Sequence, residues 1–311
     1  MNCLIVGAGI AGLAAAQALR SGGWKVTVAD KGRGPGGRLA TRRIGPQRFD
    51  HGAQYFSALS PQFRQAVEEW LAADVAAPWF EVEGSPRYRG REGMSAIAKH
   101  LAAGLDVRLS TRITRVVHRA GLWHSELEDG SILTSEALIL TPPLPQTLDL
   151  LGPLTEGLPP ALNQVTYAPC FALMLSLDGP SALPDEGYLR PESGPFTWIA
   201  DNTRKGISPG PAALTLHVSA EVTQAHYDTP HEDLAPALIE AARPAIGAAA
   251  VREWQLHRWR YSLVTQPGPE PCYFTNDPGP LALAGDAFGP PRIEGAYLSG
   301  FAAAKALSGA L

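Results

Sequence analysis

Hydrophobic residues are most regularly arranged at the start of the chain. An apolar run at Cys3–Val6 leads into a glycine-rich turn, a small-residue stretch at Leu13–Arg20 and a second apolar run at Val26–Ala29. Short apolar runs beside glycine are typical of buried strands, and the longer small-residue stretch is typical of a helix. The pattern therefore predicts a strand, a tight turn, a helix and a second strand.

Alternation of large apolar and smaller residues at Tyr167–Leu177 predicts a half-buried strand farther along the chain. Residues 107–140 predict a β-meander with turns at Ala120–Gly121 and Asp129–Gly130. Other predicted strands are Phe196–Ile199, Ala213–Ser219, Glu253–Leu263 and Leu281–Ala284. Apolar residues at helical spacing predict helices at Pro61–Asp74, Gly93–Leu101, Thr229–Ala245 and Tyr297–Leu307.

The first turn carries the motif G-x-G-x-x-G, formed by Gly7, Gly9 and Gly12, and Asp30 follows the second strand. The first glycine permits a tight turn, the second lets the backbone approach a pyrophosphate, and the third lets the helix pack against the strand. Free N–H groups at the helix N-terminus bind phosphate, and an acid after the second strand accepts hydrogen bonds from ribose hydroxyls. This context predicts a dinucleotide site rather than a glycine-rich turn that binds nothing.

Composition narrows the class of protein. The 311 residues are 45% hydrophobic and 18% charged, which is typical of a soluble globular chain large enough for two domains or one elaborate α/β unit. A net charge of −4 gives no overall attraction to nucleic acid or to an anionic membrane. Cys3, Cys170 and Cys272 lack metal-ligand spacing and suit a reducing compartment. Because a strand begins close to Met1 and no apolar run is long enough to span a bilayer, we expect a cytoplasmic protein with neither a metal site nor a membrane segment.

Two other stretches share the chemistry of the first turn. Gly36-Gly37-Arg38, with Arg33 before it, can bring backbone and guanidinium groups against a phosphate. Near the end of the chain, a predicted strand leads into Gly285-Asp286, and Glu294-Gly295-Ala296 precedes the last helix. A chain that begins and ends with nucleotide-binding features predicts one domain interrupted by insertions, and a nucleotide larger than NAD.

With these motifs, the sequence resembles the FAD-dependent enzymes of the glutathione-reductase-like fold, in their amine-oxidase branch, and most of all the renalase-like group. The resemblance extends over most of the chain. The runs that carry it are Gly7–Gly12 with Asp30, Lys31–Arg38, Thr41–Arg43, Asp50–Phe56, His257–Tyr261, Ala284–Asp286 and Arg292–Gly300.

The resemblance implies an α/β fold in which a Rossmann-like FAD-binding domain with three layers (ββα) is interrupted by a substrate domain. The substrate domain is expected to hold a mainly antiparallel sheet with flanking helices. Residues 1–56, 93–150 and 272–311 are assigned to the FAD-binding domain, and residues 57–92 and 151–271 to the substrate domain.

The resemblance also implies which residues contact FAD. It assigns the ADP half to the first motif, the pyrophosphate and ribityl chain to the arginine–glycine loop and Asp286, and the flavin edge to the start of the last helix. The expected cofactor-binding residues are Gly7, Gly9, Ile10, Ala11, Gly12, Asp30, Lys31, Arg33, Gly37, Arg38, Ile113, Gly285, Asp286, Arg292, Glu294, Gly295 and Ala296.

Lysine and cysteine usage separates this chain from many members of the branch. Many of its amine oxidases hold a water on the flavin with a lysine of the substrate domain, and only Lys205 is available for that role here. No cysteine follows Cys272, whereas the cysteine that binds flavin covalently in the family would lie near Asp286 or beyond it. We therefore expect non-covalent FAD.

The expected substrate pocket depends on alternating aromatic residues of one predicted strand. The candidates are His257, Trp259 and Tyr261, together with Gln54, Tyr55 and His51. The alternative is that the aromatic side chains pack against a helix as ordinary core, and that His51 is a core or loop histidine. Arginines at positions 42, 43, 89 and 91 are expected either to contact a phosphorylated substrate or to lie solvated on the surface.

Three hypotheses follow from the sequence. The first is a renalase-like FAD-dependent oxidase that oxidises dihydro-NAD(P) isomers to NAD(P)+ by hydride transfer to flavin N5, with reoxidation by O2 to H2O2. The second is a flavin amine oxidase for a small amine, which predicts acidic pocket residues and Lys205 beside the flavin. The third is an FAD-binding protein without turnover. The sequence leaves the oligomeric state and the choice between NAD and NADP open.

Overall fold

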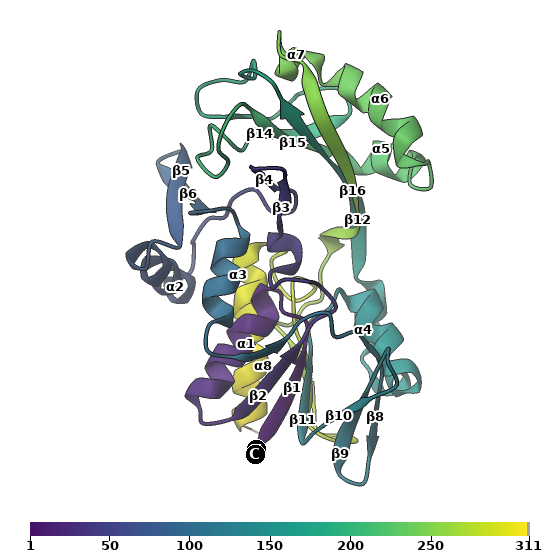
Figure 1. The fold of residues 1–311 in the computed structure, drawn as a ribbon. Helices are drawn as coiled ribbons and strands as arrows, with labels where there is room; N and C mark the ends of the chain where they lie inside the picture. The colour runs from purple at the N-terminus through teal and green to yellow at the C-terminus, as the bar shows by residue number, and fades with distance from the viewer. Residues whose placement is uncertain (310–311) are drawn as a thin grey trace.

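The computed structural model describes residues 1–309, and its lower part is built on a mixed sheet of six strands (Figure 1). The strand order is β17-β18-β11-β1-β2-β7, with β17 antiparallel to β18 and the other pairs parallel. The strands are β1 (Asn2–Val6), β2 (Lys25–Ala29), β7 (Asp106–Arg108), β11 (Ala137–Leu140), β17 (Tyr273–Thr275) and β18 (Leu281–Leu283). The strand–turn–helix–strand unit predicted at the start of the chain is confirmed by β1, α1 (Ile10–Ser21) and β2.

Helices cover one face of this sheet, and the first and last helices of the chain lie side by side there (Figure 1). These helices are α1, α3 (Ser95–Ala102) and α8 (Ile293–Gly309). A Cβ atom at Gly300 would lie 2.0 Å from the carbonyl oxygen of Ala11, so only glycine lets α8 approach α1 this closely. The two ends of the sequence therefore share one core.

A separate three-stranded antiparallel sheet, β10-β9-β8, completes the lower part. It consists of β8 (Ile113–Arg119), β9 (Leu122–Leu127) and β10 (Ile132–Ser135), and α4 (Leu144–Leu151) packs against β8. The predicted meander over residues 107–140 is thus wrong at both ends, because β7 and β11 pair with the parallel sheet. All residues of β11 are buried, which suits a central parallel strand rather than the edge of a meander.

The upper part is a five-stranded antiparallel sheet in the order β13-β14-β15-β12-β16 (Figure 1). Its strands are β12 (Thr166–Leu177), β13 (Tyr188–Leu189), β14 (Phe196–Asp201), β15 (Ala213–Val218) and β16 (Val251–Gln266). Helices α5 (Ala220–Ala225), α6 (His231–Ala241) and α7 (Arg243–Ile246) lie on one face, where Phe171, Leu173 and Leu175 form the core with α6 residues. The strand predicted at Tyr167–Leu177 is therefore confirmed, but both of its faces are buried from Phe171 to Leu175. The helix expected over Thr229–Ala245, with interruption by prolines, is divided into α6 and α7.

Two hairpins and one helix lie between these parts. They are β3 (Thr41–Ile44) with β4 (Gln47–Asp50), β5 (Ala76–Val82) with β6 (Ser85–Gly90), and α2 (Pro61–Ala72); short 3-10 helices occur at Gly37–Leu39, Gly152–Gly157 and Pro160–Gln164. Phe63 and Trp70 of α2 pack against Tyr297 of α8, while Phe80 of β5 packs against Trp198 of β14. Segment 57–92 thus contacts both parts, and the boundary between the expected domains stays a prediction.

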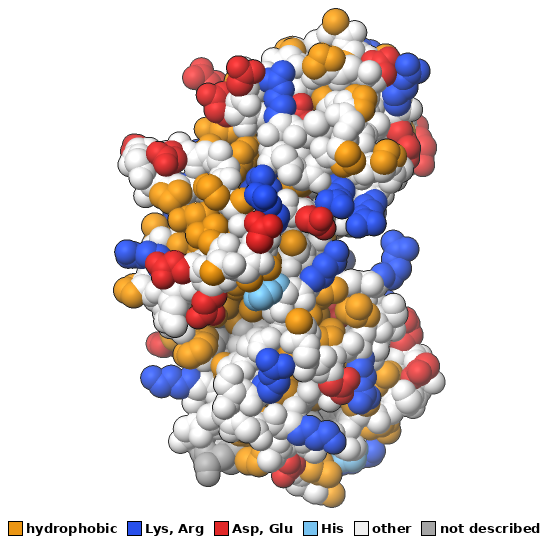
Figure 2. Space-filling model, turned by 60° about the vertical axis from the view of Figure 1, so that its left-hand side comes forward, with side chains coloured by type: hydrophobic (Ala, Val, Ile, Leu, Met, Phe, Trp, Pro, Cys, Tyr) orange, Lys and Arg blue, Asp and Glu red, His pale blue; other side chains and the backbone are white. Residues whose placement is uncertain are grey.

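The surface between the two parts is rich in charge. Figure 2 shows Lys and Arg side chains gathered at mid-height of the molecule, with acidic side chains among them. Within residues 1–309, no helix is both long enough and apolar enough to cross a membrane.

Candidate functional site

A cavity of about 2090 Å³ lies between the mixed sheet and the antiparallel sheet. Its wall includes residues at the ends of β1 and β2, the loop after β18, and residues of β14, β15 and β16. Pockets that hold drug-sized ligands measure about 300–1,000 Å³. This cavity therefore has room for a dinucleotide and a second molecule beside it.

The glycines of the first motif shape one end of the cavity. Gly7 has a φ of +107°, and a Cβ atom at Gly12 would lie 2.0 Å from the carbonyl oxygen of Gly7. A Cβ atom at Gly9 would meet no atom within 4 Å, and Gly9 lines the cavity. Gly12 thus permits close packing of α1 against the turn, whereas Gly9 leaves open space for a ligand.

Asp30 stands at the end of β2 with its carboxylate held by backbone groups. Its Oδ2 accepts a hydrogen bond from the N–H of Ala8 at 2.6 Å, and its Oδ1 accepts one from the N–H of Gly32 at 2.6 Å. A carboxylate offers about four acceptor positions, so two remain for ligand hydroxyls. Asp30 lines the cavity, where it can meet a ribose.

Arg38 and Asp286 form a bidentate ion pair across 248 residues of sequence. Besides the Asp286 carboxylate, the Arg38 guanidinium also donates to two main-chain oxygens, those of Tyr261 and Ser262, each at 3.3 Å. Desolvation acts to lower the pKa of Arg38, but Asp286 outweighs it and raises that pKa. The pair joins the loop after β2, the loop after β18 and the end of β16 at the cavity wall.

Glu294 and Gly295 have structural roles at the start of α8. The Glu294 carboxylate is buried and accepts hydrogen bonds from the N–H groups of Leu59 and Ser60 at 2.9 and 2.6 Å. A Cβ atom at Gly295 would lie 1.9 Å from the carbonyl oxygen of Pro290. Glu294 therefore holds the chain that leads into α2, and Gly295 lets the backbone at Pro290 lie close to the start of α8.

Most of the expected cofactor-binding residues line this cavity. Gly12 and Gly295 do not, because their positions serve close backbone packing. Those on the wall are Gly7, Gly9, Ile10, Ala11, Asp30, Lys31, Arg33, Gly37, Arg38, Ile113, Gly285, Asp286, Arg292, Glu294 and Ala296. Open space at Gly9, the N-terminus of α1 and the Asp30 carboxylate together fit a dinucleotide. Whether each residue contacts it stays a prediction.

Aromatic residues of β16 face the other end of the cavity. Trp259 stacks on His51 with ring centroids 5.3 Å apart, and its Nε1 donates to the carbonyl oxygen of His51 at 2.8 Å. His257 lies edge-on to both rings, at 4.9 Å from His51 and 4.4 Å from Trp259. All five predicted pocket residues, namely Gln54, Tyr55, His257, Trp259 and Tyr261, line the cavity, as does His51. The rings thus pack on one another and on His51 at the cavity wall, and their contact with a substrate stays a prediction.

Histidines at this end are held neutral. Burial, with the charges of His257 and Arg42, lowers the pKa of His51 to about 3. Burial also lowers the pKa of His217 and of His257, each to about 4. Neutral imidazoles offer both a donor and an acceptor nitrogen, so these side chains can hydrogen-bond a ligand without adding positive charge.

The two polar atoms of the Gln54 side-chain amide differ in their hydrogen bonding. Its Nε2 donates to the carbonyl oxygens of Asp50 at 2.5 Å and Gly52 at 3.1 Å, which identifies the nitrogen. Gln54 Oε1 and His51 Nδ1 are buried and have no hydrogen-bond partner among residues 1–309. Buried polar atoms are rarely left unpaired in proteins, so these two indicate a place for a ligand or an ordered water.

Arginines line the cavity with few acidic partners. Arg42 donates to Gln255 Oε1 at 3.1 Å, and burial together with the charge of Arg33 lowers its pKa. Arg43 also lines the cavity, whereas Arg89 and Arg91 do not. The sequence-based expectation of a contact with a phosphorylated substrate can thus apply to the first two arginines only.

Several residues of the cavity wall were not predicted from the sequence. Arg190 donates to the Tyr55 hydroxyl at 2.6 Å and lies over the ring of Trp198 at 5.2 Å, and His217 Nε2 lies 3.4 Å from Gln54 Nε2. His217 occupies one position in an otherwise ordinary alternating strand, and Arg190 lies in an irregular loop. No local signal marks either residue, because only the assembled sheet brings them to the cavity.

Lys205 lies behind the wall rather than in it. Its Nζ forms an ion pair with Asp50 Oδ2 at 2.7 Å, and both side chains have an exposed fraction of 0%. Lys205 is not among the residues that line the cavity. Its ammonium group is therefore committed to a protein carboxylate.

Comparisons with known proteins agree with this geometry. The profile of the family described as flavin containing amine oxidoreductase matches residues 76–308, and that of the NAD(P)-binding Rossmann-like domain matches residues 5–70. Renalase from Mus musculus is 26% identical over 98% of both chains.

Solved structures share the fold at low sequence identity. A reduced UDP-galactopyranose mutase has a TM-score of 0.73 at 13% identity, covering 100% of this chain and 96% of its own. An oxidoreductase from Methanosarcina mazei has a TM-score of 0.66 at 14% identity, covering 97% of this chain and 99% of its own. The mixed α/β fold with a Rossmann-like domain and an antiparallel sheet is thus confirmed. The chain belongs to the flavin containing amine oxidoreductase family, and it is a renalase-like flavin-dependent oxidoreductase.

Proposed function

We propose that the protein is an FAD-dependent oxidase that converts dihydro isomers of NAD(P)H to NAD(P)+, with dioxygen as the final electron acceptor. The observation that carries the proposal is the charge of the substrate end of the cavity. The antiparallel sheet and its loops contribute Arg190 and Arg260 to the wall and no carboxylate within residues 1–309, whereas the guanidinium of Arg258 is turned to the carbonyl oxygen of Tyr227 and to Asp228. Such a wall suits an anionic substrate with a flat ring, and a dihydronicotinamide dinucleotide is one.

The acidic side chains of the cavity lie in its other part. The carboxylates on the wall are Asp30, Asp149, Asp286 and Glu294, and the elements that carry them belong to the mixed sheet, α4 and α8. An amine substrate is a cation in solution, and the second hypothesis expects acidic residues in its pocket. The substrate end is therefore better suited to a dinucleotide than to a small amine.

Lys205 also favours the dinucleotide proposal over the amine oxidase. An amine oxidase that holds a water with this lysine would need the ammonium group at the cavity surface. Instead, the Nζ atom is buried against Asp50. The charge of the wall and the burial of this lysine are independent observations, and both disfavour the second hypothesis.

The protein side of the reaction is mainly positioning. When bound, the flavin supplies a two-electron acceptor for the substrate's hydride and passes those electrons to O2, giving H2O2. The stacked rings of His51 and Trp259 form a flat wall against which a planar substrate ring can be oriented. No general base is needed, because the lone pair of the ring nitrogen stabilises the cation that forms as the hydride leaves. Positioning of this kind supplies much of the barrier reduction in such reactions.

FAD is expected to be bound without a covalent link. Cys170 is the cysteine that lines the cavity among residues 1–309, and its thiol donates to the carbonyl oxygens of Phe171 and Val218. Burial raises the pKa of Cys170 to about 12, so the thiol is a poor nucleophile. Acid precipitation should release the flavin into the supernatant, where mass measurement distinguishes FAD from FMN.

Anaerobic reduction of the purified yellow protein tests the proposed activity. A panel of 2- and 6-dihydro isomers of NAD(P)H, ordinary NADH and NADPH, and small amines is mixed with the enzyme, and flavin bleaching is followed. We expect rapid bleaching by at least one isomer and none by the amines. A flavin that stays oxidised with every isomer contradicts the proposal, and bleaching by amines alone supports the amine oxidase.

A further inference from the structure

Lys205 and Asp50 connect parts of the chain that lie far apart in sequence. Lys205 follows β14, and its Nζ donates to Asp50 Oδ2 at 2.7 Å and to the carbonyl oxygen of Gln54 at 2.6 Å. The same Nζ lies 4.7 Å from the ring centroid of Trp79. A buried ammonium group with such partners is held at one position.

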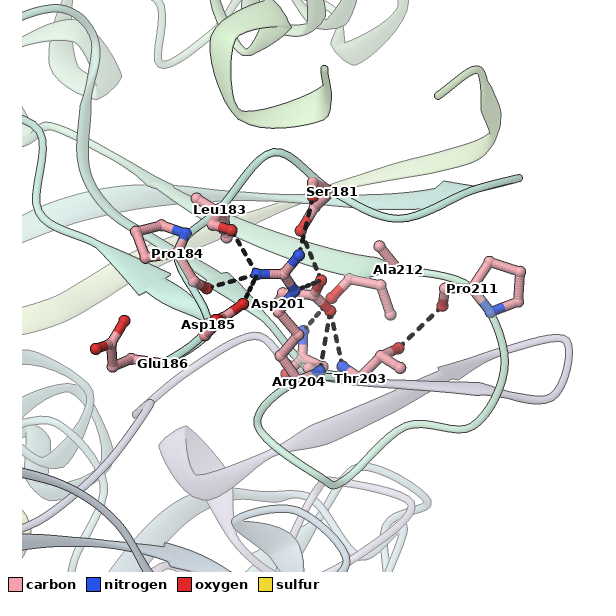
Figure 3. Close-up of polar contacts among 12 residues, drawn as sticks. Ser181, Leu183, Pro184, Asp185, Glu186, Asp201, Thr203, Arg204, Pro211 and Ala212 are labelled. Carbon is pink, nitrogen blue, oxygen red and sulfur yellow. Dashed lines mark hydrogen bonds and ion pairs between the residues drawn. The ribbon is translucent and has the colours of Figure 1, made fainter. Parts of the chain in front are cut away.

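The turn that carries Lys205 is anchored on its other side by a separate network (Figure 3). Asp201 accepts hydrogen bonds from Ser181 Oγ at 2.7 Å and from the N–H of Thr203 at 2.9 Å. The guanidinium of Arg204 donates to carbonyl oxygens of the 181–184 loop, including that of Pro184 at 2.7 Å. These hydrogen bonds therefore hold the backbone just before Lys205 in place, independently of its side chain.

Asp50 is equally well fixed at the opposite end of the ion pair. Its Oδ1 accepts hydrogen bonds from Thr41 Oγ1 at 2.6 Å and from the N–H of Met94 at 2.8 Å, and its own N–H donates to Asn202 Oδ1 at 3.2 Å. The carboxylate thus joins β3, the start of α3 and the Lys205 turn. A movement of either charged group would be resisted by several elements.

Gln54 is the residue at which this network reaches the cavity. Its carbonyl oxygen accepts from Lys205 Nζ, and its side-chain Nε2 donates to the carbonyl oxygen of Asp50. The main chain of Gln54 is therefore held by the Lys205 ammonium group, and its side chain by the main chain of Asp50. The side-chain oxygen, which has no partner among the described residues, belongs to a residue of the cavity wall.

We propose that Lys205 and Asp50 are positioning residues that hold Gln54 in place, and that Gln54 determines specificity for the substrate ring. The identity of the substrate in this inference rests on the proposed function, but the positioning does not. The lysine acts through Gln54 and does not contact the substrate.

The test is a thermodynamic cycle on the holoenzyme. The variants are Lys205→Met, the charge-free double variant Lys205→Met/Asp50→Asn, Gln54→Leu, and the triple variant that combines all three changes. Flavin content and melting temperature are measured for each, and kcat and KM are determined with whichever donor of the panel reduces the wild-type flavin. Leu238→Ala, at a buried position of α6 that does not line the cavity, is the control for loss of stability alone.

Lys205→Met should lower the melting temperature, because it leaves the Asp50 carboxylate buried without a counter-charge. The double variant removes both charges and should recover melting temperature and flavin content, yet keep a KM raised about tenfold, as expected for a displaced contact. Gln54→Leu should raise KM by a similar factor, and the triple variant should show no further loss, since all of these changes act through one residue. Leu238→Ala should lower the melting temperature without changing KM.

Recovery of the wild-type KM in the double variant, or losses that add in the triple variant, would overturn the inference. A crystal structure of the double variant gives a readout that needs no substrate: we expect Gln54 to move, because its carbonyl oxygen no longer has Lys205 as a donor, and an unmoved Gln54 would contradict the proposal. If the donor that reduces the wild-type flavin is an amine, the proposed function fails while the cycle still tests the positioning.

Discussion

Replacing His51 should remove part of the dependence of stability on pH. Burial, with the charges of His257 and Arg42, lowers the pKa of His51 to about 3, and the ordinary value for histidine is about 6.5. Below that ordinary value the unfolded chain binds a proton at this residue while the folded chain does not, so stability is lost as the pH falls. The loss begins near pH 6.5 and continues to about pH 3; at about pH 5 it amounts to about 2 kcal/mol for this one side chain.

Urea unfolding at about pH 7.5 and about pH 5, with excess FAD present, measures this difference by linear extrapolation. The wild type should lose about 2 kcal/mol more free energy of unfolding over this interval than His51→Gln does. His100→Gln, at an exposed position of α3, controls for the removal of a histidine. Equal losses in the wild type and His51→Gln would refute the argument that burial keeps His51 neutral.

Other substitutions test individual parts of the site. Gly9→Ala should weaken flavin binding with little change in melting temperature, because its methyl group enters open cavity space, whereas Gly12→Ala should destabilise the fold by about 1–3 kcal/mol through a clash with the carbonyl oxygen of Gly7. Flavin titration and thermal unfolding distinguish the two, and the reverse pattern would contradict the assignment. Glu294→Ala should cost about 2 kcal/mol in urea unfolding, since two backbone N–H groups lose their acceptor; an unchanged midpoint would show that water replaces it. Arg42→Gln should raise KM for the dinucleotide about tenfold with kcat within about twofold, the result of losing one charge-assisted contact; unchanged KM at low salt would place the phosphates elsewhere.

Local features of the sequence predict much of the dinucleotide end. Gly7, Gly9 and Asp30 lie within one strand–turn–helix–strand unit, so their spacing alone fixes their relation to one another. The alternation in β12 likewise indicates a strand, although it does not show that both faces are buried from Phe171 to Leu175. These predictions succeed because each depends on residues that are neighbours in the chain.

Features that depend on long-range pairing could not be predicted in the same way. Strand β7 has the same local character as the meander, and only its pairing with β2 assigns it to the parallel sheet. Lys205 and Asp50 are 155 residues apart, and nothing near Lys205 in the sequence indicates that its partner is a buried carboxylate. His217 reaches the cavity only because β15 lies beside β14 and β12. The substrate end was therefore less predictable than the cofactor end.

The neutral histidines give the substrate end a property that bears on catalysis. Oxidation of a dihydronicotinamide leaves positive charge on the ring, so a protonated imidazole nearby would oppose the reaction. Burial lowers the pKa of His51 to about 3 and those of His217 and His257 to about 4, and all three therefore stay neutral through the physiological range. On this basis kcat with the active donor should be constant between about pH 6 and pH 8, and should fall only as the pH approaches these values. A kcat that changes about tenfold across that interval, measured by stopped-flow reduction, would instead require a titrating group at the reacting ring.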